Sequence, residues 1–132
     1  MKKYTLVLAL FILAVKSQAQ TTLSFCTTVQ DNNCIFNNTK FITSPDSVTA
    51  KIYMFIKNDR GFGTTKVSYE LFSLDKEGTE KRLNSIEQKV EESWIYAWQP
   101  SLLNSPGKYR VKVYNANQEL ICNKSFEFFN VW

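Results

Sequence analysis

The fold class of this chain is decided by one stretch, Pro106-Gly107-Lys108-Tyr109-Arg110-Val111-Lys112-Val113-Tyr114. A Pro-Gly pair, typical of a turn, precedes side chains of strictly alternating polarity. One face carries Tyr109, Val111 and Val113, and the other carries Lys108, Arg110, Lys112 and Tyr114. A period of two with one apolar face predicts a half-buried strand of an antiparallel sheet.

The N-terminal segment has the organisation of an export signal. Lys2 and Lys3 form a charged start, residues 6–15 form an apolar run, and Ser17-Gln18-Ala19 supplies small residues at the cleavage positions. We therefore predict a signal peptide over residues 1–19. The mature domain, residues 20–132, is then secreted or periplasmic.

Two kinds of membrane attachment fit the sequence poorly. The apolar run of about ten residues is well short of the roughly 20 that a spanning helix needs. A lipoprotein carries its cysteine directly after the apolar run and behind a small residue, but the first cysteine, Cys26, follows Phe25. We expect a mature chain without a membrane span or a lipid anchor.

The mature chain carries almost no net charge. Lys2, Lys3 and Lys16 are three of the 16 basic residues and the leader contains no acid, so its removal lowers the formal charge from +4 to about +1. Nucleic-acid-binding domains have a clustered basic face and usually a pI above about 9. We therefore expect no nucleic-acid partner. The remaining residues suffice for one domain with a substantial core.

Three cysteines, Cys26, Cys34 and Cys122, are the disulfide candidates. Export permits disulfides, and an odd number leaves one thiol over in the simplest arrangement. Cys26 and Cys34 flank a polar turn, whereas a bond between Cys26 and Cys122 would tie the first strand to the last; we favour the first pairing. Zinc needs about four Cys or His ligands, and the chain has no histidine, so we expect no metal site and no cofactor.

Turn signals recur about every ten residues between segments rich in strand-forming residues, which is typical of β-sandwiches and barrels. The predicted main strands cover residues 23–29, 34–36, 48–57, 65–74, 93–99, 108–114 and 119–129. We expect Pro100 to end the strand before it. Lys124 interrupts the apolar side of the last strand, which predicts a β-bulge there.

The segment 80–93 carries two conflicting patterns. Leu83, Ile86 and Val90 have helical spacing, but the hairpin-type turn Asp75-Lys76-Glu77-Gly78 precedes them and strands lie on both sides. We favour extended structure over residues 81–90.

With these strands in place, the chain resembles immunoglobulin-like and fibronectin type III-like β-sandwich domains. Tyr109 matches the tyrosine near the start of the penultimate strand that fastens the preceding corner in such domains. The resemblance implies a single all-β, antiparallel sandwich of about seven strands. Strands 48–57 and 108–114 contain no cysteine, so the inter-sheet disulfide of antibody domains is absent. The leader's end, Gln18-Ala19-Gln20, is similar to those of small exported proteins of Bacteroidetes-type bacteria.

The residues for common catalytic chemistries are missing or scattered. Without histidine, Ser-His and Cys-His nucleophiles are excluded. The acids fall mostly in turns or on wet faces, where they serve solubility. Gly61-Phe62-Gly63 lacks the Gly-Lys-Ser/Thr ending of a phosphate-binding loop. We therefore predict a protein that is not an enzyme.

The best candidate binding residues lie in two loops that the immunoglobulin-like topology places at one end of the sandwich, 58–64 and 115–118. The first loop presents Phe62 between glycines, and a large apolar side chain on such a tip favours a docking role. The predicted recognition tip comprises Arg60, Phe62, Asn115 and Asn117. The alternative is that Phe62 folds back over the end of the sandwich.

Three other surface features each have a functional and a structural interpretation. The basic row Lys108, Arg110 and Lys112 suits an acidic partner, or is a solvated face balanced by Glu70 on the adjacent strand. The outward aromatic residues Tyr53, Phe55, Phe72 and Tyr114 suit contact with protein or sugar, or are covered by the segment 80–93 or by the C-terminal residues 130–132. Trp94, Tyr96 and Trp98 share one face of the strand 93–99. Asp46-Ser47-Val48 fits a short O-glycosylation pattern at Ser47.

These observations lead to one functional prediction and one alternative. The prediction is a non-catalytic exported binding or assembly module that contacts another envelope protein or a glycan. The alternative is an immunoglobulin-like inhibitor of exported proteases, which would also present end loops.

Overall fold

The computed structural model describes residues 20–43 and 49–130, and every regular element in them is a strand. The predictions for residues 1–19, Ser47 and Val48 lie outside this part. The strands are β1 (Thr22–Cys26), β2 (Thr28–Gln30), β3 (Asn33–Ile35), β4 (Lys40–Thr43), β5 (Ala50–Lys57), β6 (Lys66–Leu74), β7 (Glu80–Lys89), β8 (Tyr96–Leu103), β9 (Gly107–Asn115) and β10 (Leu120–Asn130). The predicted all-β class is confirmed.

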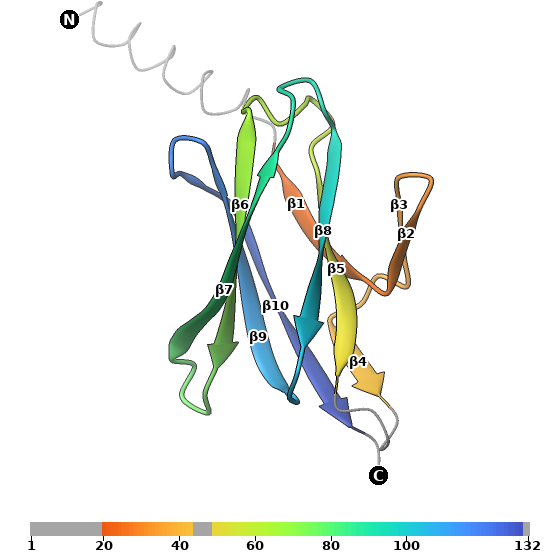
Figure 1. Cartoon of the computed structure of the whole chain (residues 1–132), viewed down its shortest axis with the longest axis vertical. Coiled ribbons are helices and arrows are strands. Elements are labelled where there is room, and N and C mark those ends of the chain that lie inside the picture. The colour runs from red at the N-terminus through yellow and green to blue at the C-terminus, as the bar shows by residue number, and fades with distance from the viewer. Residues whose placement is uncertain (1–19, 44–48, 131–132) are drawn as a thin grey trace, which may run out of the picture.

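The strands form two facing sheets and a separate hairpin (Figure 1). One sheet has the order β1-β5-β8, and the other has the order β4-β10-β9-β6-β7. Pairing is antiparallel except between β4 and β10. The hairpin β2-β3 projects beside the three-stranded sheet (Figure 1).

The core lies between the sheets, and the alternating stretch of β9 lines it as predicted. Tyr109, Val111 and Val113 are buried. The ring of Phe126 on β10 lies 5.4 Å from that of Tyr109 and 4.5 Å from that of Phe25 on β1. Residues from both sheets therefore form one apolar interior, whose burial is the main favourable contribution to folding.

Tyr109 also makes the corner contact that the resemblance implies. Its hydroxyl donates a hydrogen bond to the backbone carbonyl of Ser105, in the turn before β9. A buried phenol needs such a partner, because an unpaired hydroxyl in the core would be costly. The contact anchors the β8–β9 connection to the core.

The strand count of ten in the described residues exceeds the predicted seven by three: β7 was not among the seven, and the N-terminal region supplies two more because it is more divided than its pattern indicates. The expected strand 23–29 breaks after Cys26, where the chain leaves the sheet to form the hairpin β2-β3. A further short strand, β4, then joins the other sheet beside β10. By contrast, the ambiguous segment 80–93 contains the strand β7, as we predicted.

Pro100 does not end its strand, which corrects our prediction. The amide of Asn58 donates to the carbonyl of Ile95. The backbone N–H and C=O groups of the odd-numbered residues of β8 therefore bond to β5, and those of the even-numbered residues point away from β5. Pro100 is one of the residues whose backbone faces away from β5, and β8 is an edge strand. The missing N–H of Pro100 therefore breaks no hydrogen bond of the sheet. The strand therefore continues to Leu103.

The bulge of the last strand is also displaced from the predicted position. The register of β10 with β9 shifts between Leu120 and Cys122, whereas Lys124 pairs regularly with Val111. The polar side chain of Lys124 is accommodated half-buried, without a break in the ladder. Long basic side chains can cover apolar surface with their methylene groups in this way.

Candidate binding site

The two loops predicted to form a recognition tip do meet at one end of the sandwich. The amide of Ala116 donates to the hydroxyl of Thr64 at 3.1 Å, which joins the loops directly. Arg60 and Asn117 are exposed, while Asn115 is half-buried and its carboxamide oxygen accepts the amides of Asn117 and Glu119. Asn115 thus shapes the turn, and a ligand-binding role for the four predicted residues stays a prediction.

Phe62 packs against the core instead of standing out from the loop. Its amide donates to the carbonyl of Trp94 at 2.9 Å, and the amide of Gly63 donates to that of Glu92 at 3.0 Å. Gly61 has a φ of 91°, and a Cβ there would lie 2.7 Å from the carbonyl oxygen of Glu92. The loop 58–64 therefore supports the neighbouring loop that carries Trp94.

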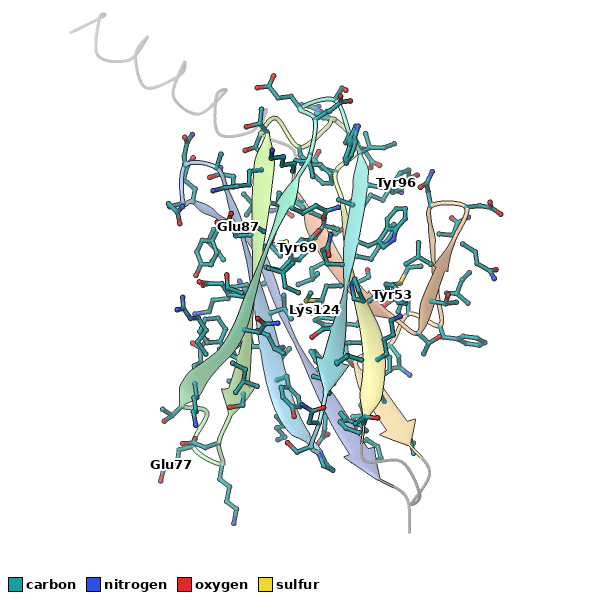
Figure 2. All side chains as sticks on the ribbon, in the orientation of Figure 1. Tyr53, Tyr69, Glu77, Glu87, Tyr96 and Lys124 are labelled. Atoms are coloured by element: carbon teal, nitrogen blue, oxygen red, sulfur yellow. A yellow bond between two sulfur atoms is a disulfide. The ribbon has the colours of Figure 1, made fainter. Side chains whose placement is uncertain are left out.

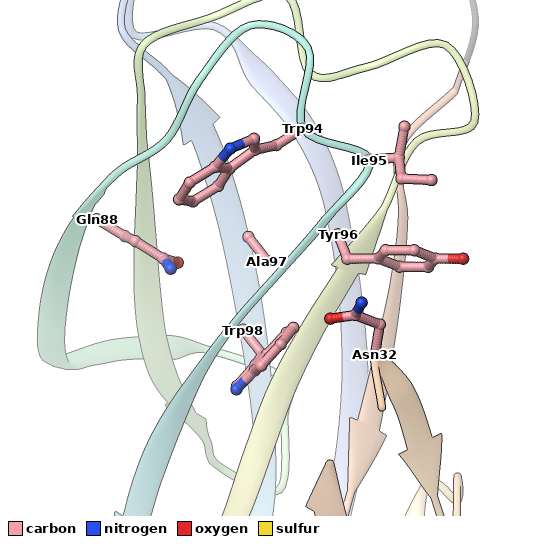
Figure 3. Close-up of a pocket in the computed structure, with 7 residues that line it drawn as sticks. All are labelled: Asn32, Gln88, Trp94, Ile95, Tyr96, Ala97 and Trp98. Carbon is pink, nitrogen blue, oxygen red and sulfur yellow. The ribbon is translucent and has the colours of Figure 1, made fainter. Parts of the chain in front are cut away.

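Beside this second loop lies a cleft of about 530 Å³, within the range of small-molecule sites of about 300–1,000 Å³. It extends along the first half of β8 between the edge of β7 and the tip of the β2-β3 hairpin (Figure 3). Its lining residues are Asn32, Gln88, Trp94, Ile95, Tyr96, Ala97 and Trp98. All seven are uncharged, and three of them are aromatic.

Tyr96 and Trp98 stand at successive outward positions of β8 and rest on the ring of Phe55 from β5. The rings of Phe55 and Trp98 are stacked, with centroids 5.9 Å apart, and the ring of Tyr96 lies 5.8 Å from that of Phe55. Phe55 itself is buried, whereas Tyr96 and Trp98 are half-buried. Phe55, which we expected to face outward, is therefore covered by these two rings, so the structural interpretation holds for Phe55.

Trp94 lies just before β8 and is 41% exposed. Its indole N–H donates to the Glu91 carboxylate at 2.9 Å, and its backbone amide donates to the Glu91 carbonyl. These contacts fix the indole at the end of the cleft. The sequence pattern placed Trp94 on the strand with Tyr96 and Trp98, but in the structure it comes from the preceding turn.

A disulfide between Cys26 and Cys34 ties the hairpin to the end of β1, which confirms the favoured pairing. At the tip, Asp31 and Asn32 both have positive φ, of 49° and 61°, as a two-residue hairpin turn of the right twist requires. The tip carries Asn32 to the cleft, where its carboxamide lies beside Tyr96 (Figure 3). Cys122 keeps a free thiol.

Gln88 reaches the cleft from β7, and a core residue fixes its orientation. The hydroxyl of Tyr69 donates to Oε1 of Gln88 at 2.7 Å. Tyr69 lies in the middle of the molecule, whereas Glu77 lies at the tip of the β6–β7 turn (Figure 2). Burial, with a smaller contribution from Cys122, raises the pKa of Tyr69. Because the phenol keeps its proton, it donates to the carboxamide oxygen of Gln88. The amide nitrogen of Gln88 is then the group that can donate a hydrogen bond to a ligand.

Two residues of the basic row on β9, Arg110 and Lys112, are paired with one acid, Glu80. Nζ of Lys112 lies 3.0 Å from Glu80, and the guanidinium of Arg110 lies 3.7 Å from the same carboxylate. Glu70, which we expected to balance the row, pairs with Arg82 at 3.1 Å. The structural interpretation of the row is therefore favoured, with Glu80 as the acid.

Neither a membrane span nor a metal centre is found among the residues that the structure describes. No helix there is long and apolar enough to span a bilayer. No cluster of three or more His, Cys, Asp or Glu residues in the same ranges has a geometry that could hold a metal ion.

Sequence reasoning placed Trp94, Tyr96 and Trp98 on one face of a strand without assigning them a role, and it missed Asn32 and Gln88. Alternating Trp, Tyr and Trp at positions 94, 96 and 98 is a visible signal. Asn32 and Gln88 come from the hairpin tip and from β7, and their sequence neighbours give no sign that they meet β8.

No family model matches the chain, and no curated protein sequence matches it significantly. Among solved structures, the chain is similar to an immunoglobulin-like protein from Pseudomonas aeruginosa, with a TM-score of 0.53, 13% identity, and coverage of 85% of this chain and 97% of that one. It also matches a CARDB domain from Pyrococcus furiosus, with a TM-score of 0.47, 10% identity, and coverage of 86% and 96%. At 13% identity the first likeness identifies the fold alone, an immunoglobulin-like β-sandwich.

Proposed function

We propose that this immunoglobulin-like domain is an exported, non-catalytic binding module that contacts a protein or a glycan of the cell envelope through the aromatic cleft beside β8. One observation carries the proposal: Trp94, Tyr96 and Trp98 stay accessible in a neutral cleft instead of being buried. Leaving large aromatic surface in water is unfavourable, and tryptophan and tyrosine are the residues most enriched in binding hot spots.

Sequence and structural features support the other parts of the proposal. The absence of histidine removes the usual general base and nucleophile partner. The leader pattern over residues 1–19 supports export, and the disulfide between Cys26 and Cys34 suits an oxidising compartment. The fold supplies a rigid scaffold for the cleft.

The experiment compares capture by the purified exported protein with capture by two variants. Trp98→Ala alters the cleft, and Asn117→Ala alters the exposed end loop. Immobilised proteins are incubated separately with the protein and polysaccharide fractions of the producing cell's envelope. We expect Trp98→Ala to lose most of the captured material and Asn117→Ala to retain it.

The opposite pattern would move the binding site to the end loops and contradict the proposed cleft. Capture that neither substitution reduces would contradict both sites. A stable complex with an exported protease, with its proteolysis blocked, would instead establish the alternative function of a protease inhibitor.

A further inference from the structure

Resting on the proposed function, we propose that the cleft binds a neutral glycan, with a pyranose ring stacked on Trp98 or Trp94 and its hydroxyl groups bonded to Asn32 and Gln88. The aromatic side chains and these two carboxamides lie around one cavity although three separate segments supply them (Figure 3).

The aromatic residues match the apolar component of a sugar. One face of a pyranose ring presents several C–H groups, whose slight positive charge suits the negative face of an indole or phenol ring. The ring of Trp98 stacks on that of Phe55 with centroids 5.9 Å apart, and the Trp94 indole donates a hydrogen bond to Glu91. The platform is therefore preorganised, and little side-chain entropy is lost when a ligand binds.

The carboxamides of Asn32 and Gln88 match the hydroxyl groups of a sugar. A sugar hydroxyl both donates and accepts hydrogen bonds, and so does the carboxamide of Asn32. Gln88 has its oxygen bonded to Tyr69, which leaves its amide nitrogen to donate to a hydroxyl oxygen. The two amides reach the cleft from β7 on one side and from the hairpin on the other.

The charges around the cleft favour a ligand without net charge. All lining residues are neutral. Glu91 lies at one margin beside the Trp94 indole. Lys57 lies at another, with its ammonium 5.6 Å from the centre of the Tyr96 ring and 3.6 Å from the Asp59 carboxylate. Since this base is paired with an acid and the lining itself is uncharged, the cleft gives no strong attraction for an anionic or a cationic ligand.

The edge of β8 makes an extended peptide a poorer occupant. Among the described strands, β8 pairs only with β5, so its other edge is open. An added peptide strand would gain its affinity from backbone hydrogen bonds along that edge. Pro100 occupies one of the outward positions and supplies no N–H, so the ladder would be interrupted there. A glycan needs no such ladder.

Tryptophan fluorescence provides a direct test, because the chain has three tryptophans and two of them line the cleft. The third, Trp132, is replaced by phenylalanine to leave only cleft signals. The exported protein is titrated with neutral oligosaccharides of glucose, mannose, galactose and N-acetylglucosamine, with polygalacturonate and with a proline-rich peptide. We expect a saturable change in emission with at least one neutral oligosaccharide and none with the other two probes.

Calorimetry on the same ligand then locates the site. Trp98→Ala should weaken binding about tenfold or more, while Trp98→Tyr, which keeps an aromatic face, should retain most of it. Asn32→Ala and Gln88→Ala should each weaken binding about fivefold. Leu120→Ala removes an exposed apolar side chain from the other sheet and serves as the matched control. Asn32 is exposed at a hairpin tip, so its substitution leaves a folded protein even if Trp98→Ala unfolds.

Several results would overturn the inference. They are the absence of a response to all the neutral sugars, tighter binding of polygalacturonate or of the proline-rich peptide, or unchanged sugar affinity in both Trp98→Ala and Asn32→Ala. If an envelope protein is captured in a Trp98-dependent manner while no sugar binds, the proposed function stands and the glycan inference fails.

Discussion

The hydroxyl of Tyr69 donates a 2.7 Å hydrogen bond to Oε1 of Gln88, and this contact connects the interior of the sandwich to the cleft. Tyr69 is almost completely buried on β6, whereas Gln88 is half-buried on β7 and lines the cleft. The register pairs Gln88 with Val67 and Tyr69 with Ile86, so the hydrogen bond runs diagonally between the two strands. A core residue therefore sets which end of the Gln88 carboxamide a ligand meets.

Replacing Tyr69 with phenylalanine should affect stability and ligand binding together. Loss of the hydrogen bond should lower the free energy of unfolding by about 1 kcal/mol. Binding in the cleft should weaken several-fold, because the Gln88 amide can then rotate. Urea denaturation and ligand titration measure the two effects, and Tyr53→Phe on the outward face of β5 is the control. Unchanged binding in a folded Tyr69→Phe protein would show that Gln88 needs no such positioning.

Removing the disulfide should disable the cleft more than the fold. The Cys26→Ala/Cys34→Ala variant loses a cross-link with a sequence separation of 8 residues, which is worth about 2–3 kcal/mol. The hairpin then loses its attachment, and Asn32 is no longer held at the cleft. Thermal denaturation should show a folded protein with a lower Tm, and titration should show weaker binding than in Asn32→Ala alone. Cys122→Ala, which leaves the disulfide intact, is the control. Full affinity in the double variant would contradict the positioning role of the hairpin.

Much of the architecture follows from local patterns in the sequence. The alternation around Tyr109 predicted a buried face of β9, and the hydroxyl of Tyr109 makes the corner contact implied by the family resemblance. The strand over residues 81–90 was also correctly favoured over a helix, because its flanking turns are local signals. Such features depend on neighbouring residues alone.

The features that escaped prediction depend on contacts between distant segments. From the sequence alone, Pro100 indicates the end of a strand. Only the hydrogen-bond register of β8 with β5 shows that the backbone nitrogen of Pro100 points away from β5, where no N–H is needed. Lys124, the one lysine on the apolar side of β10, suggested a bulge at its own position, and nothing in the local sequence shows that the bulge lies between Leu120 and Cys122. Asn32 meets β8 only because the Cys26–Cys34 hairpin is attached beside it.

Gly61→Ala should disturb the turn that carries Trp94. The new Cβ would lie 2.7 Å from the Glu92 carbonyl, and the φ of 91° disfavours any side chain. We expect a loss of about 1–3 kcal/mol in the free energy of unfolding, with a shift in Trp94 emission. Gly63→Ala is a matched control, since Gly63 has a φ of 64° but no atom within 4 Å of the place that its Cβ would take. Equal effects of the two substitutions would mean that backbone strain alone, without contact to Glu92, accounts for the loss.

The free thiol of Cys122 should react very slowly in the folded protein. Burial raises the pKa of Cys122 from an ordinary value of 9.0 to about 12. Since only the thiolate reacts, and each pKa unit lowers its population tenfold, alkylation at pH 8 should be slower by roughly a thousandfold than in the unfolded chain. Mass spectrometry after iodoacetamide treatment measures this rate, with urea-unfolded protein as the control. Rapid labelling without urea would show that the thiol is accessible.

The same shift predicts a loss of stability in alkaline solution. Above pH 9.0 the thiol of the unfolded chain loses its proton, while the folded protein keeps it until about pH 12. The unfolded state then binds fewer protons, so the free energy of unfolding falls as the pH rises through this window, by at most about 1.4 kcal/mol per pH unit. Cys122→Ala removes this contribution, while the other titrating groups are common to both proteins. Urea denaturation from about pH 8 to about pH 11 should therefore show a shallower decline for Cys122→Ala, and parallel curves would contradict the burial of the neutral thiol.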